Sequence, residues 1–61
     1  MAKFSIMLFG IDSYTKNQMQ LPYKLDAKSA DVALREARMC AMTFYPRFEE
    51  TEKPDLEVVK R

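Results

Sequence analysis

The stretch Phe4-Ser5-Ile6-Met7-Leu8-Phe9-Gly10-Ile11 decides the fold of this chain, because it is apolar on both faces of a β-strand. Side chains alternate along a strand, which gives one set of Phe4, Ile6 and Leu8 and a second set of Met7, Phe9 and Ile11. One layer of helix can cover only one of these sets. We expect the second set to be the uncovered one, because Ser5 dilutes it. That face then needs a partner.

The length of the chain limits it to one small domain. A domain of 61 residues buries only about 60% of the surface that its unfolded chain exposes. Such domains usually depend on a disulfide, a metal or association. Cys40 is the single cysteine, and the absence of histidine leaves too few ligands for a zinc site. We therefore expect residues 1–61 to form one domain that associates with itself as a homodimer or higher oligomer.

The composition argues against several classes of protein. Ten basic and nine acidic residues give a net charge of +1, whereas nucleic-acid binders typically carry a basic stripe. The hydrophobic fraction of 48% is typical of an ordered domain. The apolar run near the N-terminus is too short to span a membrane and lacks a small-residue cleavage site. We expect a cytoplasmic protein with no membrane partner, and nucleic acid is a disfavoured partner.

Two further segments have strand patterns. Residues 19–25 alternate between apolar and polar side chains, and Pro22 places this strand at a sheet edge. Residues 56–60 are rich in β-branched side chains and follow a charged connection over residues 47–55. If the helix between them makes a right-handed crossover connection, the last strand is parallel to the second strand. With the last strand on the far side of the first, the prediction is an α+β domain of ββαβ order. Its three-stranded antiparallel sheet has the order 2-1-3, and one helix packs on one face.

The helix is predicted from Ala30 to about Phe44. Ser29 can cap its first turn, and Pro46 stops it because the residue before a proline avoids helical geometry. The core face should carry Ala30, Ala33, Leu34, Ala37, Cys40, Ala41, Phe44 and Tyr45. The opposite face carries a second apolar group: Val32, Met39 and Met42. These three side chains are either isolated exposed residues or a second contact surface.

The residue types exclude most catalytic chemistry. Without histidine, neither a Ser-His-Asp nor a Cys-His arrangement can form, so we expect no catalytic residue, metal or cofactor. The single glycine, Gly10, excludes a glycine-rich phosphate loop and predicts a bulge or a close backbone approach. Four basic residues could still hold an anion, particularly between subunits: Lys24, Arg35, Arg38 and Arg47. Alternatively, Arg35 forms an ion pair with Asp31 one turn earlier.

The helix-opening segment Asp26–Leu34 follows a hairpin, and in this it resembles the start of HicB-type antitoxins over about half of the chain. The glycine-rich hairpin of those proteins is absent here. In length and style the chain also resembles very short α+β proteins of bacteriophages, which inhibit or redirect host enzymes or defence systems. That resemblance implies an inhibitor.

We therefore predict a non-catalytic interaction protein that self-associates and blocks a larger protein target. The predicted interface residues are Met7, Phe9, Ile11, Val32, Met39 and Met42. One alternative is an oligomeric binder of a phosphorylated small molecule, with a site between subunits. A second alternative is a nucleic-acid-associated regulator, in which Tyr14, Lys16 and Tyr23 contact a single-stranded base.

Overall fold

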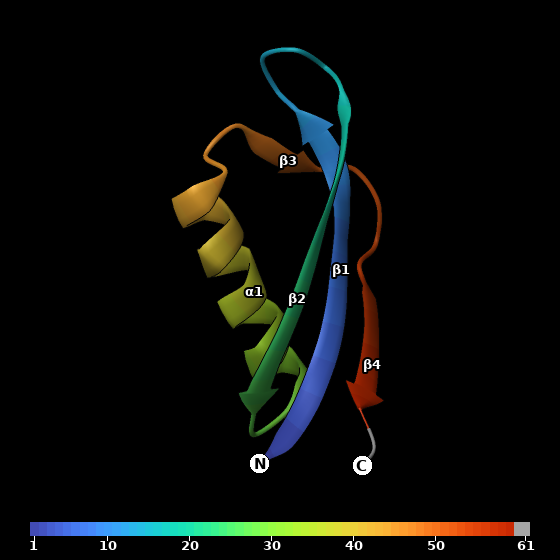
Figure 1. The fold of residues 1–61 in the computed structure, drawn as a ribbon, viewed down its shortest axis with the longest axis vertical. Helices are drawn as coiled ribbons and strands as arrows, with labels where there is room; N and C mark the ends of the chain where they lie inside the picture. Colours follow the sequence, from blue (N-terminus) through green and yellow to red (C-terminus); the bar gives the residue numbers. More distant parts are fainter. Residues whose placement is uncertain (60–61) are drawn as a thin grey trace.

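A computed structural model describes residues 1–59, and it contains a four-stranded antiparallel sheet with one helix on one face (Figure 1). The elements are β1 (Ala2–Asp12), β2 (Gln18–Ala27), α1 (Ala30–Phe44), β3 (Phe48–Glu50) and β4 (Asp55–Val59). β2 pairs with one edge of β1, while β3 and β4 both pair with the other edge. The predicted α+β class, the antiparallel order and the central position of β1 are confirmed. Lys60, the last residue of the predicted final strand, lies outside the described residues.

The charged connection predicted over residues 47–55 contains a short strand, β3, that was not predicted. β3 pairs with Gly10–Asp12 of β1, and β4 pairs with Lys3–Met7. Residues 51–54 lie between the two strands, opposite only Leu8 and Phe9. The Thr51 amide donates to the Phe9 carbonyl at 3.1 Å, so the chain stays close to β1 across this bulge. β3 and β4 therefore form one interrupted edge of the sheet.

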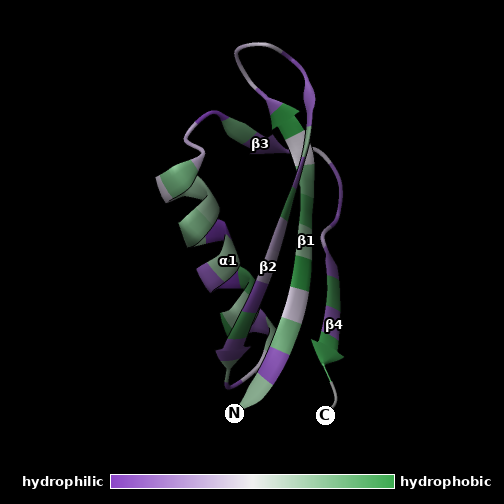
Figure 2. Ribbon diagram, in the orientation of Figure 1, coloured by the Kyte–Doolittle hydropathy of each residue, from purple (hydrophilic) through white to green (hydrophobic). Residues whose placement is uncertain are grey.

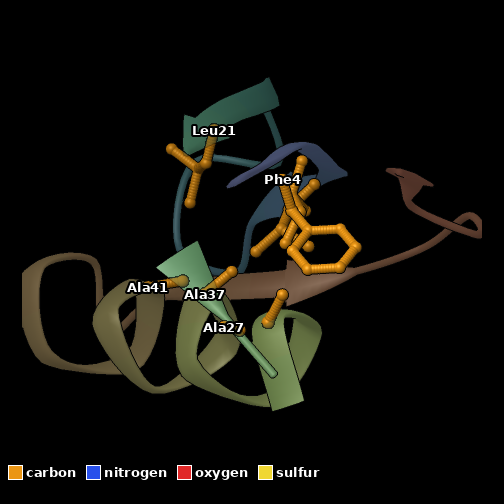
Figure 3. Packing of buried hydrophobic residues seen from close by; sticks show 8 residues of the cluster. Phe4, Leu21, Ala27, Ala37 and Ala41 are labelled. Carbon is orange, nitrogen blue, oxygen red and sulfur yellow. The ribbon is translucent and has the colours of Figure 1, made fainter. Parts of the chain in front are cut away.

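The core lies between α1 and one face of β1 (Figure 3). Ile6 and Leu8 are its two largest fully buried side chains. The complete buried set is Phe4, Ile6, Leu8, Leu21, Ala27, Ala33, Ala37 and Ala41. The other alternating set of β1, which is Met7, Phe9 and Ile11, is only half-buried. Figure 2 shows that β1 is apolar over much of its length, although α1 covers only one of its faces. The predicted orientation of β1 is therefore confirmed.

The helix begins and ends where the sequence predicts. The Ser29 hydroxyl accepts a hydrogen bond from the Val32 amide at 3.3 Å, as an N-cap does. At the other end, the Tyr45 amide donates to the Ala41 carbonyl at 2.7 Å, and Pro46 follows. Residues before and after α1 thus satisfy backbone groups that the helix itself leaves free.

The predicted core face of the helix was too wide. Ala30, Cys40, Phe44 and Tyr45 are exposed, although they were expected to be buried. Val32, which was placed on the outer face, is half-buried against the core. The reason is the stripe of Ala33, Ala37 and Ala41, which lets the helix backbone lie close to the sheet over a narrow contact. α1 is also inclined to the strands, and its last turn stands away from β2 (Figure 1).

Candidate functional site

One candidate site lies where the end of α1 meets β3, around the half-buried ring of Phe48. Two hollows share this ring. The first is lined by Asp12, Met19, Phe44, Tyr45, Pro46 and Arg47 together with Phe48. The second is lined by Leu8, Arg38, Ala41, Met42 and Glu50 together with Phe48. We call the apolar side chains Met42, Phe44, Tyr45 and Phe48 the Phe48 surface.

Three of the four residues of the Phe48 surface are exposed, and Phe48 itself is half-buried. Met42 is 73% exposed and Phe44 is 72% exposed. Tyr45 is exposed beside them at the helix C-cap. Met42 and Phe44 are two residues apart in α1, so they point in different directions, and each lines a different hollow beside Phe48. Exposed apolar groups that gather around one feature are typical of an interaction surface, whereas single exposed residues are not.

Two arginines flank the Phe48 surface, and each is held in place by a neighbour. The Arg38 Nε donates to Glu50 Oε1 at 2.6 Å and its Nη2 donates to Glu50 Oε2 at 3.1 Å. These hydrogen bonds raise the pKa of the Arg38 guanidinium. The guanidinium carbon of Arg47 lies 4.6 Å from the centroid of the Tyr14 ring, in a cation–π contact. Both side chains therefore have less conformational entropy to lose when a partner binds.

The loop between β1 and β2 fixes the position of Tyr14. The Asp12 carboxylate accepts hydrogen bonds from the backbone amides of Thr15 and Tyr14, and these bonds lower the pKa of Asp12. The Ser13 amide donates to the Arg47 carbonyl at 2.7 Å, which ties the loop to the segment before β3. Lys16 adopts the left-handed conformation, with φ of 66°, and closes the turn. Arg47 covers one face of the Tyr14 ring, which reduces its value as a base-stacking platform.

A second candidate surface is the face of the sheet opposite α1, which we call the open face. Its centre is the half-buried stripe of Met7, Phe9 and Ile11. Directly paired residues in antiparallel strands project from the same face. Lys24 and Glu57 are both paired with Ser5, so they flank the stripe at one level. The open face therefore has an apolar centre and a charged rim.

The predicted interface residues divide between two opposite sides of the molecule. Met7, Phe9 and Ile11 lie on the open face. Met39 and Met42 are exposed on α1, which covers the other face of the sheet. Val32 is half-buried against the core and offers less free surface than predicted. A single partner surface cannot contact both groups at once.

The four predicted anion-binding residues do not converge within one chain. Lys24 projects from the open face, whereas Arg35 and Arg38 belong to the helix on the opposite face. The guanidinium of Arg38 is engaged by Glu50, and that of Arg47 is stacked on Tyr14. Among residues 1–59, Arg38–Glu50 is the ion pair that forms, and the Asp31–Arg35 pair considered from the sequence is absent.

Two side chains near the helix, Cys40 and Tyr23, carry groups that could react. Cys40 is an exposed free thiol, not the core residue that the sequence predicted. The hydroxyl oxygen of Tyr23 is buried and has no hydrogen-bond partner within the described part of the chain. Burial raises the pKa of Tyr23, which keeps the phenol neutral.

Across residues 1–59, no group of three histidine, cysteine, aspartate or glutamate side chains is arranged to hold a metal ion.

Sequence reasoning missed three residues of the Phe48 surface, namely Phe44, Tyr45 and Phe48, and also Glu50, which lines one of the two hollows. Helical periodicity assigns Phe44 and Tyr45 to the core, and Glu50 falls in the charged connection predicted over residues 47–55. The signal that could have found them is local composition, because residues 44–48 combine three aromatic residues with a proline and an arginine. Aromatic residues and arginine are enriched in protein interfaces.

The helix of the described chain is too short and too polar to cross a membrane.

Comparison with known proteins adds no assignment: no protein family, curated protein or solved structure matches this chain. The resemblances to HicB-type antitoxins and to short bacteriophage proteins receive no support from these comparisons.

Proposed function

We propose that this protein is a non-catalytic protein-binding module whose Phe48 surface contacts a larger protein target. The observation that carries the proposal is the grouping of Met42, Phe44, Tyr45 and Phe48 around two adjacent hollows. Methionine, aromatic residues and arginine are the residue types that interface cores favour. Water contact with these apolar side chains is unfavourable, and a partner that covers them removes that contact.

The geometry also indicates what kind of protein surface would fit. An apolar side chain of the target could enter a hollow beside Phe48, in the manner of an interface hot spot. The guanidinium carbon of Arg47 lies over the Tyr14 ring, and the N–H groups of this arginine could donate to a carboxylate of the target. The proposed target surface therefore has an apolar anchor with acidic groups beside it.

Inhibition is the effect that we propose for this contact. A small module without catalytic residues acts on its target by covering a functional surface, and the apolar contact supplies the affinity. We place the protein in the cytoplasm, in keeping with the free, exposed thiol of Cys40.

The experiment compares four tagged proteins as baits in a lysate of the organism that encodes the chain. They are the wild type, Met42→Lys, Phe44→Lys and the matched control Met39→Lys. Met39 is also an exposed methionine of α1, but it lines neither hollow. We expect one protein to be retained by the wild type and by Met39→Lys, and to be lost with the other two variants. Equal retention by all four baits, or no retained protein, would contradict the proposal. Circular dichroism checks that each variant is folded.

A further inference from the structure

We infer that two copies of this chain stack through their open faces, with a two-fold axis parallel to β1. This surface differs from the Phe48 surface, so the inference does not depend on the proposed function. α1 covers one face of the sheet, and residues 1–59 supply no second layer for the other. The stripe of Met7, Phe9 and Ile11 is therefore only half-buried. A second copy would complete the layer structure that a sheet with two apolar faces requires.

The rim of the open face has two different margins. Along β3 and β4 the residues that flank the stripe are acidic: Glu49 is paired with Ile11, Asp55 with Met7 and Glu57 with Ser5. Along β2, the residues at the same three levels are Gln18, Pro22 and Lys24. Beyond the level of Ser5, the next residue of β1 on this face is Lys3, which is paired with Asp26 on β2 and with Val59 on β4. At the levels of Ser5, Met7 and Ile11, one margin is thus negative and the other is neutral or positive.

These margins select the symmetry axis. Rotation about an axis parallel to β1 places the β2 margin of one copy over the β4 margin of the other. Lys24 then faces Glu57 of the second copy, and the contact occurs twice because the interface is isologous. Rotation about an axis across the strands at the level of Met7 instead places Asp55 over Asp55 of the second copy, which is repulsive. The first arrangement is therefore the favoured one, and it also packs the apolar stripe on itself.

The dimensions suit such a dimer. The chain measures 38 × 17 × 15 Å, so its broad face is of the order of a standard interface, about 800 Å² per partner. Stacked sheets lie about 10 Å apart with strand directions within about 30° of each other, which an axis along β1 allows. A chain of 61 residues also gains stability by association, because a dimer stabilises the folded state by mass action.

The test is the dimer dissociation constant, measured by sedimentation over a concentration series. Lys24→Glu and Glu57→Lys each place like charges together at two contacts. We expect each to weaken the dimer by about tenfold, which corresponds to 1.4 kcal/mol. The double variant Lys24→Glu/Glu57→Lys exchanges the charges and should recover wild-type affinity. Glu36→Lys, which makes the same charge change on the exposed helix surface, is the matched control and should have no effect.

Two further variants test the apolar centre. Phe9→Lys and Met7→Lys should each give a folded monomer, as judged by circular dichroism and sedimentation together. Met42→Lys should leave the dimer intact, since it alters only the Phe48 surface. A wild type that stays monomeric throughout the series would overturn the inference. A double charge exchange as weak as the single variants, or a dimer that survives Phe9→Lys, would do the same. None of these results depends on whether a target protein is found.

Discussion

Adding a single methyl group at Gly10 should have a large effect on the stability of the fold. Gly10 lies in β1 opposite Glu50, and β3 passes very close to it. A Cβ atom on Gly10 would collide with the carbonyl oxygen of Glu49. The same Cβ atom would lie 2.8 Å from the carbonyl carbon of Glu49 and 2.7 Å from Cε1 of Phe48. The nearest obstacle is backbone, so no side-chain rotation can relieve the collision. Gly10→Ala therefore has to push β3 away from β1.

The size of the effect follows from two opposed contributions. Replacing glycine by alanine reduces the entropy of the unfolded chain, which stabilises the fold by about 0.4–1 kcal/mol. Overpacking a closed site costs about 1–3 kcal/mol, and displaced β3 loses backbone hydrogen bonds worth about 1 kcal/mol each. We expect a net loss of about 2–3 kcal/mol. In a domain of this size, that lowers Tm by about 10–20 °C.

Urea denaturation followed by circular dichroism measures this loss, with Ser5→Ala as the control. Ser5 is on the same strand but half-buried on the open face, so its variant should lie within about 0.5 kcal/mol of wild type. Hydrogen exchange adds a local readout, because the Thr51 amide donates to Phe9 beside the displaced strand and should exchange faster. A Gly10→Ala variant with the wild-type urea midpoint and unchanged exchange would refute the close approach of β3.

Two further substitutions test the helix cap and the buried phenol. Ser29→Ala removes the acceptor for the Val32 amide. In urea titrations, its free energy of unfolding should be lower than that of the wild type by about 1 kcal/mol. A loss under about 0.3 kcal/mol would contradict the capping role. Tyr23→Phe removes an unpaired buried hydroxyl, so its free energy of unfolding should equal the wild-type value or exceed it by up to about 1 kcal/mol. Burial raises the pKa of Tyr23 above its usual 10.0, so the wild type should lose stability as the pH rises through that range and the folded pKa. Tyr23→Phe should lack this part of the alkaline loss, and identical pH profiles of the two proteins would contradict it.

The fold was predictable because its main signals are local. The double apolarity of β1, the alternation in β2 and the cap at Ser29 each act within a few residues. β3 could not be found in this way, because Phe48–Glu50 is short and mostly charged. Its position is set by distant groups instead. Gly10 leaves room for its backbone, and Arg38 forms an ion pair with Glu50.

The candidate sites were less predictable because they depend on how far the helix extends over the sheet. A helical repeat places Phe44 on the same side as the alanines, so periodicity alone assigns it to the core. In the fold, the close contact of α1 is confined to the narrow stripe of Ala33, Ala37 and Ala41, and the end of the helix beyond this stripe stands away from β2 (Figure 1). The angle of α1 relative to the sheet is a tertiary property, and it decides that Phe44 is exposed.

The opposite placement of the two proposed surfaces has a consequence for how the protein would act. The open face lies on one side of the sheet, and the Phe48 surface lies at the end of α1 on the other. A dimer formed through open faces buries neither helix, so it presents two Phe48 surfaces on its outside. A target that is itself oligomeric would then meet two linked binding surfaces, and the second contact would form at a high effective concentration. Loss of dimerisation through Phe9→Lys should therefore weaken binding to such a target while leaving the Phe48 surface unchanged. Binding to a monomeric target should be unaffected by the same variant.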